Sequence, residues 1–200
     1  GRAAALYFGE KQRGESLPGI LIGRDTRLSG PMFEAALATG ICSAGGQAIL
    51  AGVIPTPAIA WLTKKLGYQA GIVVSASHNP FYDNGLKVIN GNGEKVSGDF
   101  IAEIEAYLDG EIGEIPLATG EKIGRTVDFF AGRNRYIGYL ISIATHSFKG
   151  RKIALDCANG SASSVAKAVF DALGADTHVL SDAPNGYNIN EHCGSTHMEA

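Results

Sequence analysis

Along the first half of the chain, apolar runs of strand length alternate with segments whose apolar residues recur at helical spacing. Strands are predicted for four short runs, at 20–22, 48–53, 72–74 and 86–89. A helix is predicted after Pro31, with Phe33 and Leu37 on one face. A second helix is expected to begin with Thr56 as its N-cap and to end at Gly67. Such alternation indicates an α/β fold.

The pattern starts again in the second half of the chain. Ile101, Ile104 and Leu108 mark one more amphipathic helix, and residues 109–124 are rich in glycine and charge, as linkers are. A helix over about 128–144 then leads into a strand–helix–strand unit, with strands at 152–156 and 176–180.

These features divide the chain into a first domain of residues 1–122 and a second of residues 123–200. The first residues, GRAAAL, have the composition of the inside of a helix, and the chain does not begin with methionine. We therefore expect a chain shortened at its N-terminus.

Three of the predicted strands end in polar loops, which begin at Arg24, Ser75 and Cys157. Parallel strands joined by right-handed crossovers end on the same side of a sheet. Arg24 and Ser77 are therefore expected to converge. The loop after Asp156 belongs to the second domain and reaches them only if the two domains dock that way; otherwise it is a simple turn.

The loop after the strand at 72–74 contains several side chains that can react or bind ligands. Its sequence, SASHNPFYDNGLK over 75–87, holds two serines, a histidine, an aspartate and a lysine. The pairs Asn79-Pro80 and Asn84-Gly85 are turn signals that fold such a loop tightly. Polar groups just beyond a buried strand are where α/β proteins usually keep their reactive residues.

This loop resembles the phosphoserine loop of the α-D-phosphohexomutases. The stretch FYDNGLK is most similar to the phosphoglucosamine mutase branch of that family. Further matches come in the family's order and cover nearly the whole chain: GRDTRLSG at 23–30, PTP at 55–57, DCANG at 156–160 and PNG at 184–186. The resemblance implies a mixed-sheet α/β domain of the phosphohexomutase type, followed by part of a second, similar α/β domain.

The resemblance assigns roles to single residues. Ser77 would carry the phosphoryl group, Lys87 would act as general acid/base, and His78 would be a third catalytic residue. Arg24 and Asn79 would bind phosphate; the planar fork of an arginine matches phosphate oxygens. Phosphorylated Ser77 would also be one ligand of Mg²⁺, a cation that prefers oxygen. The three aspartates of the family's metal loop have no counterpart here, so the other ligands are expected outside this chain.

Alternatives stay open for several of these residues. Ser75 competes with Ser77, and only the register of the motif favours Ser77. Adjacent side chains of an extended segment point to opposite faces, which favours a supporting role for His78. Lys87 is otherwise a solvated lysine on an edge strand, and Arg27 a surface charge.

Charge and cysteine content narrow the class of protein. A net charge of −3 without a basic tract argues against nucleic acid as a partner. Three cysteines without C-x-x-C spacing favour reduced thiols and a cytoplasmic location. No apolar run approaches the roughly 20 residues that span a bilayer, so no membrane contact is expected.

The activity implied by the resemblance is the interconversion of glucosamine 6-phosphate and glucosamine 1-phosphate, which feeds amino-sugar nucleotide and cell-wall synthesis. A sugar 1,6-bisphosphate would be the intermediate and the activator, and the family allows a homodimer. The alternatives are a phosphoglucomutase or phosphomannomutase, or a phosphate-binding module without catalysis. The 200-residue chain alone is expected to be inactive.

Overall fold

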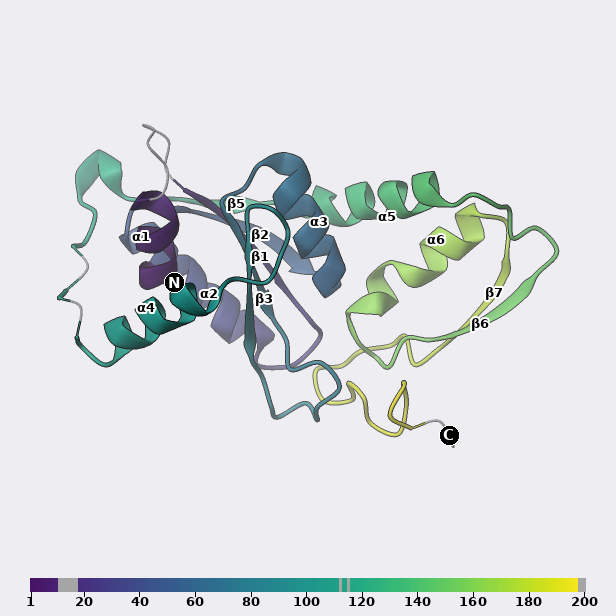
Figure 1. Ribbon diagram of the computed structural model, residues 1–200. Coiled ribbons are helices and arrows are strands. Elements are labelled where there is room, and N and C mark those ends of the chain that lie inside the picture. Colours follow the sequence, from purple (N-terminus) through teal and green to yellow (C-terminus); the bar gives the residue numbers. More distant parts are fainter. Residues whose placement is uncertain (11–17, 112, 115, 198–200) are drawn as a thin grey trace.

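Two separate sheets organise the chain, as Figure 1 shows for the computed structural model. The structure describes residues 1–10, 18–111, 113–114 and 116–197. The larger sheet has five strands and carries helices on both faces, and the smaller has two parallel strands with one helix beside them. The predicted α/β class is confirmed.

The five strands of the larger sheet run in the order β4-β3-β1-β2-β5. All neighbours are parallel except β3 and β4, so the sheet is mixed, as expected. The strands are β1 (Gly19–Arg24), β2 (Gln47–Val53), β3 (Ala70–Val74), β4 (Leu86–Asn90) and β5 (Thr126–Asp128). Four of them were predicted; β5 was not, because three exposed residues carry no readable alternation.

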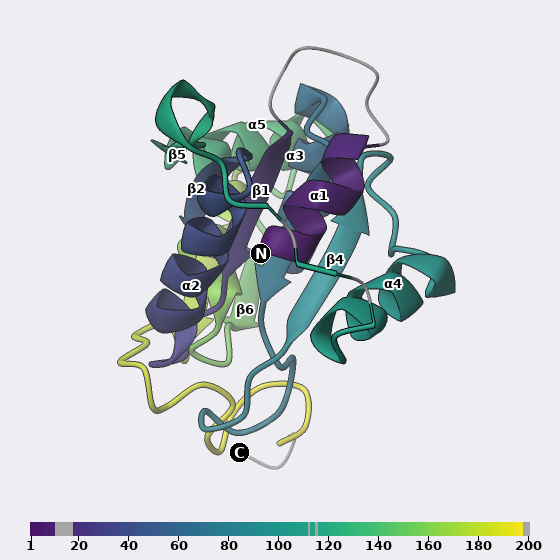
Figure 2. The ribbon, with the colours of Figure 1, turned by 90° about the vertical axis from the view of Figure 1, so that its left-hand side faces the viewer.

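Helices cover both faces of this sheet because its central strands are apolar on both sides. Ile20 and Ile22 of β1 pack into one core with the helices on the first face, and Leu21 packs into the core on the other. Figure 2 shows α1, α2 and α4 together on the first face. The helices are α1 (Arg2–Glu10), α2 (Gly30–Ser43) and α4 (Gly98–Leu108) on that face, and α3 (Thr56–Leu66) and α5 (Ala131–Ile143) on the other.

The smaller sheet forms the strand–helix–strand unit that the sequence predicted. Its members are β6 (Lys152–Asp156), α6 (Ala166–Ala172) and β7 (Asp176–Leu180), with β6 and β7 parallel. Short 3₁₀ turns lie at Gly120–Lys122 and Ser161–Ser164. Outward positions of β6 and β7 alternate with half-buried ones, so this unit has a thinner core than the larger sheet.

α5 connects the two units. Its Tyr139 stacks on Trp61 of α3 with ring centroids 4.4 Å apart, and the same helix also contacts α6. β5, just before it, pairs with β2. The larger sheet therefore includes residues beyond 122, and the division of the chain into domains of residues 1–122 and 123–200 remains a prediction.

Two local expectations were wrong in detail. Thr56 is the first residue of α3 and makes no capping hydrogen bond; the extended residue before the helix is Pro55. In α4 the buried residue is Phe100, whereas Ile101 and Leu108 are 42% and 74% exposed. Periodicity located this helix, but its packing contacts decided which face turned inward.

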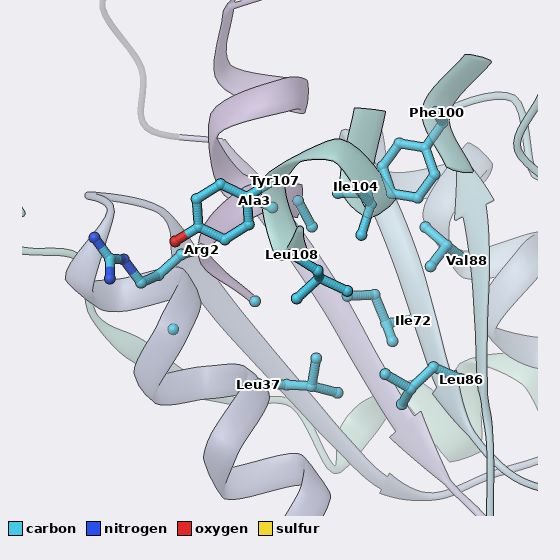
Figure 3. A pocket seen from close by; sticks show the side chains of 13 residues that line it. Arg2, Ala3, Leu37, Ile72, Leu86, Val88, Phe100, Ile104, Tyr107 and Leu108 are labelled. Atoms are coloured by element: carbon cyan, nitrogen blue, oxygen red, sulfur yellow. The ribbon is translucent and has the colours of Figure 1, made fainter. Parts of the chain in front are cut away.

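An apolar cavity of about 400 Å³ lies between α1, α2, α4 and the sheet. Figure 3 shows side chains from these elements around it, among them Leu37, Ile72, Val88 and Ile104. The helices thus leave part of this face of the sheet open. Among the described residues, no helix combines the length and the apolar character that crossing a bilayer requires.

Candidate active site

Loops from both units line a second cavity, of about 330 Å³, at the carboxyl ends of β1, β3 and β6. The loop after β3 contributes Ser75, Ser77 and His78, and β4 contributes Lys87. The loop after β6 contributes Cys157 and residues 160–162. The loops after β1 and β3 meet at this edge of the sheet through Asp25 and Ser77, but Arg24, which was expected to converge with Ser77, does not line the cavity. The loop after Asp156 does reach the cleft. Both ribbon views show the loop after β3 beside the C-terminal stretch (Figures 1 and 2).

The structure separates the two serines of the loop. Ser75 is 8% exposed, and its Oγ accepts a hydrogen bond from the backbone N–H of Ser77, at 3.1 Å. Ser77 is exposed to the cavity, and its φ is +58°. That left-handed conformation costs a residue other than glycine roughly 1–3 kcal/mol and persists only where neighbours hold it. Ser75 thus supports the loop, whereas the hydroxyl of Ser77 is open to a ligand.

Arg27 is the residue that holds the loop. Its Nη2 donates to the carbonyl oxygens of Ser77 and Asn79 at 3.0 and 2.9 Å, and its Nη1 donates to those of Pro80 and Asp83. Four backbone acceptors of an irregular loop are thereby satisfied by one planar guanidinium.

The interpretation of Arg27 as a surface charge was wrong. Its side chain is 0% exposed, and its Nε forms an ion pair with Oδ2 of Asp25 at 2.9 Å. The backbone N–H of Arg27 donates to the other carboxylate oxygen. A loop rich in asparagine, glycine and proline has many backbone carbonyls that secondary structure does not satisfy. Those carbonyls need donors, and this was the one signal in the sequence for a buried arginine nearby.

Lys87 and His78 share the cavity with Ser77. Lys87 is half-buried on β4, where it lies opposite Val73 of β3. Ser77 is left-handed, so the segment is not extended, and the expectation that His78 and Ser77 point to opposite faces does not apply here. A hydroxyl, an imidazole and an ammonium group therefore line the same cavity.

Arg24 and Asn79 engage other partners in this structure. Nε of Arg24 donates to Oε2 of Glu34 on α2 at 3.1 Å. Nδ2 of Asn79 donates to Oδ2 of Asp83 at 3.0 Å. Neither residue is among those that line the 330 Å³ cavity.

The second unit closes the cavity through the loop after β6. Burial raises the pKa of Asp156, but hydrogen bonds from the backbone N–H groups of Ala158 and Gly194, at 2.8 and 2.6 Å, and from the side chain of Ser181 together lower the pKa overall. Burial, together with the carboxylates of Asp182 and Asp156, raises the pKa of the Cys157 thiol. The thiol is therefore kept protonated and is a poor nucleophile.

The described residues do not by themselves form a magnesium site at Ser77. No group of three or more metal-ligating side chains gathers among them. The carboxylate in the cavity lining, Asp25, already uses both oxygens on Arg27. The expected role of Ser77 as a metal ligand remains a prediction, since the residues at hand do not complete a coordination shell.

Comparison with known proteins yields one family. Residues 1–112 match the family model described as phosphoglucomutase/phosphomannomutase, alpha/beta/alpha domain I. The phosphoglucosamine mutase of Lachnospira eligens is 55% identical over 199 residues, and that of Staphylococcus aureus is 48% identical over 193 residues. These matches cover 100% and 96% of this chain but only 44% and 43% of the relatives.

A solved structure shows the same fold. The phosphoglucomutase/phosphomannomutase family protein of Burkholderia thailandensis is 27% identical, with a TM-score of 0.73. The match covers 92% of this chain and 40% of that protein. The chain thus spans less than half the length of the relatives described here.

Proposed function

Because the chain belongs to the phosphoglucomutase/phosphomannomutase family, we propose that it is part of a phosphoglucosamine mutase. The enzyme would interconvert glucosamine 6-phosphate and glucosamine 1-phosphate in the cytoplasm and so feed amino-sugar nucleotide and cell-wall synthesis. The observation that carries the proposal is Ser77, exposed in a cavity beside Lys87 and His78 and held in a strained conformation. The high identity to two phosphoglucosamine mutases favours this sugar.

In the proposed reaction, phosphorylated Ser77 donates its phosphoryl group to a free hydroxyl of the sugar phosphate. The bond between phosphorus and the Ser77 oxygen breaks, and a bond to the sugar oxygen forms, which gives a 1,6-bisphosphate. The bisphosphate turns over, and its other phosphoryl group returns to Ser77. A cavity open to solvent on one side suits a carrier that must receive and release a bulky sugar phosphate.

Lys87 is proposed to accept the proton of the attacking hydroxyl and to return it in the reverse step. General acid/base groups contribute about 10²- to 10⁴-fold in rate. His78 is proposed to assist at the same cavity, while Arg24 and Asn79 are proposed to bind phosphate once released from Glu34 and Asp83. Magnesium ligands other than Ser77 are proposed to come from outside this chain.

A phosphoglucomutase or phosphomannomutase is the second candidate, favoured by the solved relative from Burkholderia thailandensis. The test is a coupled assay of the full-length protein that contains this chain, with glucosamine, glucose and mannose 6-phosphates in parallel. The proposal expects the highest kcat/KM for glucosamine 6-phosphate.

Two variants accompany the assay. Ser77→Ala should reduce turnover to background, because no carrier remains, whereas Ser142→Ala, an exposed serine on α5, should be unaffected. A preference for glucose or mannose phosphate would favour the second candidate. Wild-type turnover in Ser77→Ala would exclude Ser77 as the carrier.

A further inference from the structure

Two carbonyl oxygens of the loop after β3 each accept hydrogen bonds from both units of the protein. Nη2 of Arg27 donates to the carbonyls of Ser77 and Asn79 at 3.0 and 2.9 Å. Nδ2 of Asn190, near the C-terminal end of the chain, donates to the same two carbonyls, each at 3.0 Å. A carbonyl oxygen has two lone pairs, so each acceptor is filled once from either side.

The loop that carries Arg27 also holds the second unit. Oγ1 of Thr26 donates to the carbonyl of Asn159 at 2.5 Å, and the backbone N–H of Leu28 donates to the carbonyl of Gly186 at 2.9 Å. Arg27, between them, turns the other way, into the loop after β3. Three successive residues thus fasten the reactive loop and the second unit to one segment.

Asn190 is suited to this contact by its own backbone. Its φ is +60°, a conformation that asparagine adopts far more readily than most residues. Its amide supplies two N–H groups, which matches the two acceptors. Phe81 and Tyr187, with ring centroids 5.2 Å apart, pack edge to face beside it and bring the same two segments together.

We propose that Asn190 is a positioning residue for Ser77. It fixes the carbonyl of Ser77 from the second unit, opposite Arg27, so the left-handed orientation of Ser77 depends on the docking of that unit. The loop is thereby ordered only when both walls of the cavity are in place. The consequence for phosphoryl transfer rests on the function proposed above, but the ordering of the loop does not.

The experiment measures hydrogen exchange by mass spectrometry in the full-length protein, with each variant brought to the same phosphorylation state. Asn190→Asp keeps the size of the side chain and its tolerance of positive φ but replaces the donor by an oxygen. Exchange of the loop over residues 76–85 should become about tenfold faster, as expected for the loss of one to two net hydrogen bonds. Asn188→Asp is the matched control, because among the described residues the side-chain amide of Asn188 bonds only within its own segment, to the backbone of Asn185 and Ala183.

Kinetics give the second readout. In Asn190→Asp, kcat should fall about tenfold while KM for the sugar phosphate stays within twofold, since Asn190 acts through the loop. Loop exchange equal to that of the wild type, or faster exchange with unchanged kcat, would overturn the proposal. A wild-type protein without turnover would refute the proposed function. The hydrogen-exchange rates of the loop would then still test whether Asn190 orders it.

A further variant keeps the test valid if Asn190→Asp fails to fold. If Asn190→Asp exchanges faster throughout β1 and β3, the variant has unfolded. Asn190→Gly, which accepts positive φ and also lacks the donor, then carries the same test. Faster exchange confined to the loop supports the proposal, and unchanged exchange overturns it.

Discussion

Among single residues, the buried pair of Arg27 and Asp25 carries the largest expected effect on stability. Arg27→Met would leave the carboxylate of Asp25, which is 5% exposed, without its cation, and would remove one hydrogen-bond donor from each of four loop carbonyls. Removing one partner of a buried pair typically costs about 3–5 kcal/mol. We expect the free energy of unfolding to fall by that amount, measured in urea by the fluorescence of Trp61, the single tryptophan of this chain.

Arg24→Met in the same segment is the control. The ion pair of Arg24 with Glu34 is partly exposed, and such pairs contribute about 1 kcal/mol or less. Equal losses in the two variants would mean that the buried bonds of Arg27 add nothing beyond an ordinary ion pair.

At the scale of the elements, α3 packs closely against the sheet at Gly71. A Cβ on Gly71 of β3 would lie 2.5 Å from Oγ1 of Thr63 and 2.6 Å from Cγ2 of Ile59, both on α3. Overpacking of this kind typically costs about 1–3 kcal/mol. Gly71→Ala should therefore lower the free energy of unfolding within that range, measured by the same urea titration.

Gly98→Ala provides the comparison for this prediction. Gly98 is the first residue of α4, and an added Cβ there meets no atom within 4 Å. The free energy of unfolding of Gly98→Ala should match or slightly exceed that of the wild type. A loss in Gly71→Ala no larger than that in Gly98→Ala would show that α3 can move away without cost.

Helices and strands could be predicted from the sequence where the segment was long and periodic or where it formed a continuous apolar run. The buried runs of β1, β2 and β3 and the helix from Gly30 followed directly from composition and turn signals. β5 was missed because its pairing with β2 is a long-range contact that its own three residues do not encode. The inward face of α4 was misjudged because Phe100, not Leu108, meets the core.

The residues of the candidate site were likewise predicted in part and missed in part. The motif pointed to Ser77, and the strand order placed its loop at the correct edge of the sheet. The roles of Arg27 and Asn190 were not foreseen, because each depends on bonds to backbone carbonyls 50 or more positions away in the chain. Side-chain partners of that kind appear only once both units are folded together.

At the scale of the whole molecule, the cavity belongs to neither unit alone. Lys87 and Ser77 come from the larger sheet, whereas Cys157 and Asn190 come from the segment that follows α5. α5 itself packs on α3 and contacts α6, so it links the two units that supply the walls of the cavity. A phosphoryl carrier at such a junction can be reached by substrate and still be ordered from both sides.

The central claim is that Ser77 carries the phosphoryl group, and tandem mass spectrometry tests it most directly. Trypsin cleaves after Lys65 and Lys87 and releases residues 66–87, which contain both serines of the loop. After incubation of the full-length protein with a hexose 1,6-bisphosphate, fragment ions should place phosphate on Ser77 and leave the buried Ser75 unmodified. Phosphate on Ser75, or an unmodified peptide under conditions in which the protein turns over its substrate, would contradict the account.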